Sequence, residues 1–265
     1  MLGEHDMAAL RILGHSTRRQ AMLSIFLLSA LTLFTNAPAL AQDHPSHDHH
    51  AGMSMSSNQP MNPAVQAKFM ADKRESEFNH HLAGFFLVLA GLFILAQVTV
   101  LNHFRSVRYA WPACFLLSGL FLLVFSDTEL WPFGRQSWIH GLSSHPEVLQ
   151  HKTFAIILLA LGFIEVARAR ERLKAVWAAW AFPVFAMAGS VLLLFHSHNA
   201  GVHGPDHMAL MERIQSQHLS YSVTGFGIGI SKGLSEVRGR WQQVFSKIWP
   251  ALMIALGVLL MFYTE

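Results

Sequence analysis

The segment AGFFLVLAGLFILAQVTVL, residues 83–101, decides the class of fold, because it contains no charged side chain. A helix of about 20 apolar residues is long enough to cross the hydrocarbon core of a bilayer. Over the whole chain, 52% of the residues are hydrophobic and only 13% are charged. That is too little charge to cover the surface of a water-soluble domain. The sequence therefore predicts an all-α, polytopic membrane protein.

Five further apolar segments have a similar character, and together they predict a bundle of six transmembrane helices arranged as three helical hairpins. The loops on one side carry ten Lys and Arg residues and the opposite loops carry three. Because loops rich in Lys and Arg stay in the cytoplasm, we expect the C-terminus and the mature N-terminus to be periplasmic. The six predicted spans are 79–101, 108–126, 151–168, 176–196, 214–233 and 248–263.

The N-terminal region predicts export to a bacterial inner membrane. Residues 1–41 have a basic start, an apolar core and the small-residue sequence Ala39-Leu40-Ala41, as in a cleavable signal peptide. An uncleaved anchor is the alternative, and it also leaves the following residues outside the cytoplasm. Residues 42–75 are polar and cannot bury a core, so we expect a disordered, periplasmic His/Met-rich tail. Residues 76–265 are then the six-helix transmembrane domain.

Histidine and methionine concentrate on the predicted outer side, in the tail, at helix ends and in the loop before the fifth span. Imidazole and thioether groups are ligands for copper and its neighbours, so we expect a metal site there. The alternative for each histidine is an ordinary interfacial or hydrogen-bonded role. The candidate ligands are His44, His47, His49, His50, Met53 and Met55 in the tail, and His81, His151, His196, His198, His203, His207, Met208, Met211 and His218 beyond it.

The three hairpins also resemble one another, as internal repeats of membrane folds do. A histidine near the start of each is followed 31 or 32 residues later by a proline: His81 by Pro112, His151 by Pro183, and His218 by Pro250. Trp111-Pro112-Ala113 also matches Trp249-Pro250-Ala251. The repeat predicts equivalent places for the three histidines, which could then converge on one metal ion.

Several other residues have two interpretations. Glu77 and Glu147 lie four residues before His81 and His151, so on a helix they could orient those rings. Asp127 and Glu129 are interpreted as interfacial charges, with metal ligation as the alternative. Glu165 with Arg168 is a local ion pair or part of a proton path. Two further sets have a structural interpretation. A close-packed helix face is predicted for Gly225, Gly229 and Gly233. A belt mostly at the membrane interface is predicted for the tryptophans Trp111, Trp131, Trp138, Trp177, Trp180, Trp241 and Trp249.

The multi-span region, the histidines at outer helix ends and the exported tail, residues 43–61, resemble the bacterial family called copper resistance protein D. The resemblance covers residues 43–263 and implies copper uptake or tolerance. We therefore expect an inner-membrane copper-binding protein for resistance, uptake or delivery. Beyond the lipid bilayer and the metal ion, its expected partners are a periplasmic copper chaperone or a membrane oxidase. Nucleic acid is not expected, because the basic residues lie in short loops.

Two alternatives remain open from the sequence. One is a b-type haem electron carrier, with His81 and either His151 or His218 as axial ligands. The other is an accessory factor for metallation of a membrane oxidase. The sequence has no nucleophile–base arrangement and no nucleotide-binding motif, so we expect a binding protein rather than an enzyme. The single cysteine, Cys114, excludes an intrachain disulfide and a cysteine-based zinc or iron–sulfur site.

Overall fold

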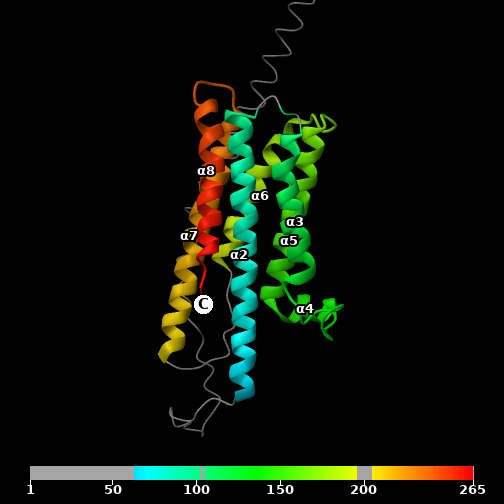
Figure 1. The fold of residues 1–265 in the computed structure, drawn as a ribbon, viewed down its shortest axis with the longest axis vertical. Coiled ribbons are helices and arrows are strands. Elements are labelled where there is room, and N and C mark those ends of the chain that lie inside the picture. Colours follow the sequence, from blue (N-terminus) through cyan, green and yellow to red (C-terminus); the bar gives the residue numbers. More distant parts are fainter. Residues whose placement is uncertain (1–62, 102–103, 105, 196–204, 265) are drawn as a thin grey trace, which may run out of the picture.

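The computed structural model describes residues 63–101, 104, 106–195 and 205–264, and every regular element in these ranges is a helix (Figure 1). The predicted signal peptide and most of the tail therefore lie outside the described residues. The elements are α2 (Pro63–Thr99), the short 3₁₀-helix η1 (Val107–Tyr109), α3 (Ala110–Phe125), α4 (Trp138–Ser144), α5 (Pro146–Ala169), α6 (Val176–Leu194), α7 (Pro205–Glu236) and α8 (Gln242–Met261).

A helix corresponds to each of the six predicted apolar segments. Four of these are long and apolar enough to cross a membrane by length and composition: Gln66–Thr99, Val107–Phe125, Val176–Leu194 and Gln242–Met261. These helices indicate a membrane protein. The other two long helices, α5 and α7, carry buried charged side chains, among them Lys152 and Lys232. The short helix α4 was not predicted.

One boundary of the prediction is wrong. Helix α2 begins at Pro63, so residues 63–75 are helical rather than part of a disordered tail. Contacts stabilise this extension: Lys73 pairs with Glu77 one turn later at 3.7 Å. The Glu75 carboxylate also accepts hydrogen bonds from the backbone N–H and the hydroxyl of Thr128, after α3.

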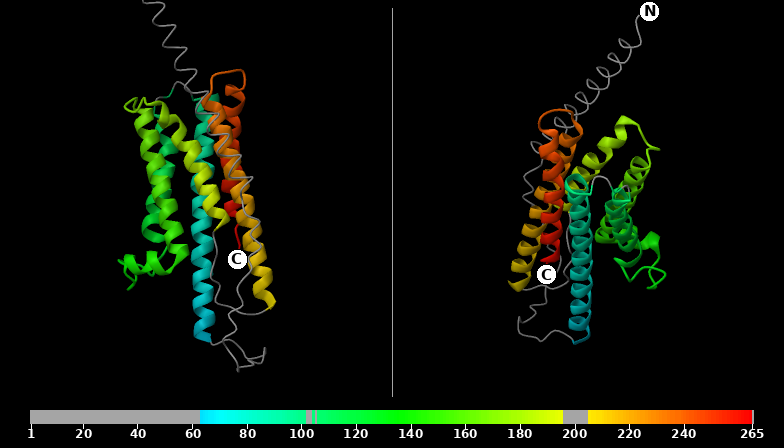
Figure 2. Two further views of the ribbon diagram at one scale, coloured as in Figure 1. Left: turned by 180° about the vertical axis from the view of Figure 1, so that it is seen from behind. Right: turned by 45° about the horizontal axis from the view of Figure 1, so that its top comes forward.

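The six long helices form a closed ring. Helix α2 packs against α3 and α8, α3 against α5, α5 against α6, α6 against α7, and α7 against α8. Figure 2 shows the bundle from two further directions, with α4 projecting sideways beside the start of α5. Each hairpin therefore contacts the next through its second helix, and the last hairpin closes on the first.

The aromatic residues that precede the three repeat prolines meet at the centre of the ring. Trp111, Phe182 and Trp249 each precede one of the three repeat prolines, and their rings form a triangle. The ring centroids are 6.2 Å apart for Trp111–Phe182, 6.0 Å for Trp111–Trp249 and 5.3 Å for Phe182–Trp249, all tilted edge to face. Such arrangements are favourable between aromatic rings. Trp111, Trp180 and Trp249 are buried rather than interfacial, which corrects the expectation of a belt for them.

Small residues let the hairpins approach closely at three equivalent seams. Seven residues after each repeat proline stand Gly119, Ser190 and Gly257. A Cβ on Gly257 would lie 2.6 Å from the Gly84 carbonyl oxygen, and one on Gly119 would lie 3.1 Å from that of Ala155. At the third seam the Ser222 hydroxyl donates to the Ser190 carbonyl at 2.8 Å. Close backbone packing of this kind is typical of membrane helices.

Part of the predicted glycine face of α7 lies at the seam with α6. A Cβ on Gly225 would lie 2.3 Å from the Ser190 hydroxyl oxygen, and one on Gly229 would lie 3.0 Å from the Pro183 carbonyl oxygen. The prediction of a close-packed face is confirmed at these two glycines.

Candidate functional site

Polar side chains gather at the end of the bundle where α3 and α8 end and α5 begins. We call this the histidine end and define it by Asn79, His80, His81, Asp127, His151, Lys152, His218 and Tyr263. It consists of two groups of contacting residues. The groups are neighbours, because Asn79 belongs to one of them and the next two residues of α2 belong to the other. In Figure 1 this end of the bundle lies in the lower part of the view, at the level of the C label and α4.

The first group places His80 and His218 around Tyr263. The His80 ring stacks on the Tyr263 ring with centroids 3.8 Å apart. The His218 ring lies 6.1 Å from that of His80, 6.0 Å from that of Tyr263 and 5.8 Å from that of Tyr221. His218 is 3% exposed and Tyr263 is completely buried. We call these residues, with His81, the His80–His218 cluster.

Hydrogen bonds to backbone carbonyls define the tautomers of two rings in this cluster. His80 Nδ1 lies 2.8 Å from the Ser76 oxygen, and His81 Nε2 lies 3.0 Å from the Tyr263 oxygen. A carbonyl can only accept, so each of these nitrogens must donate. In the neutral rings the lone pair is then on His80 Nε2 and His81 Nδ1. A ring whose second nitrogen donates to an oxygen has the arrangement usual for metal-binding histidines.

The second group, the Asp127 cluster, is a buried ion-pair network. Asp127 accepts from His151 Nδ1 at 3.0 Å and from Lys152 Nζ at 2.7 Å. Ser126 donates to Asp127 at 2.5 Å and accepts from Lys152 Nζ at 3.1 Å. The Asn79 side chain donates to the Ser126 carbonyl at 3.2 Å, which links α2 to the network. The carboxylate therefore joins the end of α3 to the start of α5.

This network makes stability depend on pH. Burial raises the pKa of Asp127, but the hydrogen bond and charge of His151, with hydrogen bonds from Lys152 and Ser126, outweigh it and hold the pKa below its ordinary value of 3.8. The ionised carboxylate therefore contributes stability that is complete above about pH 4 and is lost as the pH falls through the lowered pKa. In detergent, we expect the melting temperature to fall below that pH, and to fall less steeply in Asp127→Asn. Equal acid slopes in the two proteins would contradict the assignment.

The predicted trio His81, His151 and His218 divides between the two groups. His81 and His218 belong to the His80–His218 cluster, whereas His151 pairs with Asp127 on another side of the bundle. Within the described ranges, no three His, Cys, Asp or Glu side chains are placed so that they could hold a metal ion. The hydrogen-bond acceptors are the Tyr263 carbonyl for His81 and the Asp127 carboxylate for His151. Glu77, which was predicted to orient His81, pairs with Lys73.

The other candidate ligands have little structural description. The six tail residues and three loop histidines lie outside the described residues. The backbone of His207 and Met208 belongs to α7, but their side chains are not described, and Met211 is partly exposed on the same helix. The residues outside the description are His44, His47, His49, His50, Met53, Met55, His196, His198 and His203.

Sequence reasoning missed four residues of this end, which are Asn79, His80, Lys152 and Tyr263. His80 had a signal, because it stands beside His81, but the repeat pointed only to the second of the pair. Lys152 is one of the three basic residues assigned to the opposite loops, yet its side chain is 4% exposed. Tyr263 lies close to the C-terminus, where nothing in the pattern distinguishes a buried side chain from an exposed one.

Comparisons with protein-family models, curated proteins and solved structures find no match.

Proposed function

We propose that α2, α3, α5, α6, α7 and α8 all cross a bacterial inner membrane as three hairpins, with the histidine end facing the periplasm. The ring of contacts supports this, because α5 and α7 are enclosed by helices that are apolar enough to span. Their buried charges pair with other side chains, as charges inside a membrane protein do. The excess of Lys and Arg in the opposite loops supports the orientation.

Labelling of single cysteines tests this arrangement. In a Cys114→Ala background, we expect Ser143→Cys in α4 to react with a membrane-impermeant maleimide in cells with a permeabilised outer membrane. Arg172→Cys, between α5 and α6, should react only after the inner membrane is opened. Both positions are exposed, so a difference in labelling reports the side of the membrane. The reverse pattern, or equal labelling, would contradict the orientation.

For the function, we propose copper binding at the histidine end, for copper resistance, uptake or delivery. The observation that carries it is the His80–His218 pair, with ring centroids 6.1 Å apart. A metal–imidazole bond is about 2 Å long, so two imidazoles that share one ion have centroids roughly 6 Å apart. The tautomer of His80 leaves a lone pair on Nε2, and copper accepts such nitrogen ligands.

The His/Met-rich segments supply the rest of the proposed pathway. The loop with His196, His198 and His203 joins α6 to α7, and α7 carries His218. Residues of this loop and of the exported tail would collect the ion and complete its coordination. A periplasmic copper chaperone or a membrane oxidase fits as a partner on that face.

A paired substitution tests the copper site in the full chain. His80→Phe/His218→Phe keeps two aromatic rings in the cluster but removes their nitrogens. We expect it to weaken the tightest Cu(I) binding at least about tenfold, measured by competition with a chromophoric chelator. The matched control is His140→Phe/His145→Phe, because those rings are also 6.1 Å apart but lie exposed on and beside α4. Equal affinities in the two variants would refute the proposed site.

A further inference from the structure

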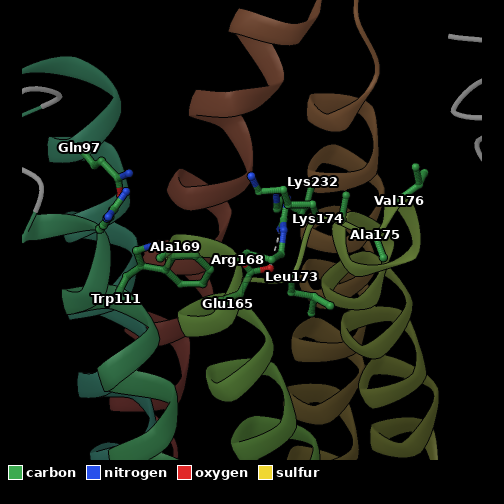
Figure 3. Close-up of a pocket in the computed structure, with 12 residues that line it drawn as sticks. Gln97, Trp111, Glu165, Arg168, Ala169, Leu173, Lys174, Ala175, Val176 and Lys232 are labelled. Atoms are coloured by element: carbon green, nitrogen blue, oxygen red, sulfur yellow. Dashed lines mark hydrogen bonds and ion pairs between the residues drawn. The ribbon is translucent and has the colours of Figure 1, made fainter. Parts of the chain in front are cut away.

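A second polar site lies at the end of the bundle opposite the histidine end. A cavity of about 390 Å³ opens between the end of α2, the start of α3, the end of α5 and the start of α6, with α7 behind it. Figure 3 shows the Trp111 ring extending towards the α5 end, where Glu165, Arg168 and Lys232 lie together. Gln97 borders the opposite side. None of these residues takes part in the proposed copper site.

The charges around this cavity do not balance. Arg168 donates to Glu165 at 2.7 Å and to Glu236 at 3.3 Å, and Lys232 also pairs with Glu236. Two carboxylates thus pair with two cations, so their charges cancel. The predicted Glu165–Arg168 ion pair is present and belongs to this four-residue network. The remaining basic residues that line the cavity are Arg108 and Lys174.

Arg108 and Lys174 give the cavity its excess positive charge. Arg108 donates to the Tyr109 hydroxyl at 3.1 Å and lies 5.2 Å over the Tyr109 ring, which orients its guanidinium. Among the described residues, neither Arg108 nor Lys174 pairs with a carboxylate. The cavity therefore has a net charge of about +2 and offers guanidinium and ammonium donors, the groups that bind phosphate oxygens.

We propose that this cavity binds a phosphate group, carried by an anionic lipid headgroup or by free phosphate. Basic pockets between membrane helices on the cytoplasmic side bind such headgroups. Arg108 contacts the phosphate from η1 and Lys174 contacts it from the loop before α6. The Glu165–Arg168–Glu236–Lys232 network holds the ends of α5 and α7 in place behind it. The proposal depends on the charge of the cavity and not on copper binding.

Titration of the purified full chain in a neutral detergent tests the site. The probes are short-chain phosphatidylglycerol, phosphatidylcholine and inorganic phosphate, and the readouts are melting temperature and native mass spectrometry. Phosphatidylglycerol should bind more tightly than phosphatidylcholine. Arg108→Gln/Lys174→Gln should weaken that binding roughly thirtyfold, since each basic residue near a lipid surface contributes about one kcal/mol. The control Arg170→Gln/Arg172→Gln removes the same charge from the neighbouring loop, outside the cavity.

Each outcome is decisive. Loss of phosphatidylglycerol binding in Arg108→Gln/Lys174→Gln, but not in the control, supports the site. The ligand is then a lipid headgroup if inorganic phosphate does not bind, and the phosphate group alone is sufficient if phosphatidylglycerol and inorganic phosphate both bind. Equal loss in the control would overturn the proposal in favour of general surface attraction, and so would equal binding of the two lipids. Melting of both variants without ligand is measured first. If Arg108→Gln/Lys174→Gln does not fold, the single variant Lys174→Gln replaces it, because Lys174 is exposed.

Discussion

Replacing Lys152 with methionine is expected to lower the free energy of unfolding by roughly 3 kcal/mol, because it leaves the buried Asp127 carboxylate without its closest cation. Lys152 Nζ lies 2.7 Å from Asp127, and the two side chains are 4% and 9% exposed. The ammonium also donates to Ser126 and to the Leu122 carbonyl. For a domain of this size the loss corresponds to a fall of roughly 6–12 °C in melting temperature.

The matched control is Lys68→Met. Lys68 also pairs with a carboxylate, that of Glu129 at 3.2 Å, but these side chains are 68% and 61% exposed. Exposed pairs contribute at most about 1 kcal/mol, so this variant should melt close to the wild type. The double variant Lys152→Met/Asp127→Leu should regain part of the stability, since no buried carboxylate is then left without its lysine. Equal effects of the two single lysine substitutions would contradict the buried network.

Replacing Gly84 with alanine is expected to cost about 2 kcal/mol by separating the first hairpin from the last. The added Cβ would lie 2.5 Å from the Gly257 carbonyl oxygen, and a backbone atom cannot move aside as the end of a side chain can. Overpacking of this kind usually destabilises by about 1–3 kcal/mol. Thermal unfolding in detergent, followed by circular dichroism, measures the effect.

Gly227→Ala on α7 provides the control for this seam. Its Cβ would lie 3.3 Å from the end of the flexible Leu252 side chain, which can adjust. Alanine also favours a helix over glycine by about 1 kcal/mol, so this variant should be neutral or slightly more stable. Greater stability in Gly84→Ala than in Gly227→Ala would contradict the seam.

The sequence predicted the helices well, because long apolar runs have few alternatives to a helix in a membrane protein. The repeat was also readable, since Trp111-Pro112 and Trp249-Pro250 are nearly identical in context. Phe182-Pro183 was harder to recognise as the third copy, because the aromatic residue differs. Only the ring contacts place all three at one centre. The sequence does not reveal that α2 begins at Pro63, because the first turns are polar and are held by contacts with the loop after α3.

The candidate site was less predictable, for physical reasons. The repeat placed His81, His151 and His218 at similar heights, but equivalent positions in a ring of helices face different neighbours. His151 forms an ion pair with Asp127, whereas His80, His81 and His218 all lie around Tyr263. Such choices depend on loop and terminal residues, which lack the periodicity that identifies helices.

The central claim, copper binding at the histidine end, is tested most directly by metal analysis and an absorption spectrum on one purified sample. The full chain in detergent is compared with His80→Phe/His218→Phe. The account predicts at least one copper ion per wild-type chain, loss of one tightly bound ion in the variant, and no Soret band in either. A Soret band that disappears in the variant would identify a haem protein instead, and a wild-type chain with neither copper nor haem would contradict the account.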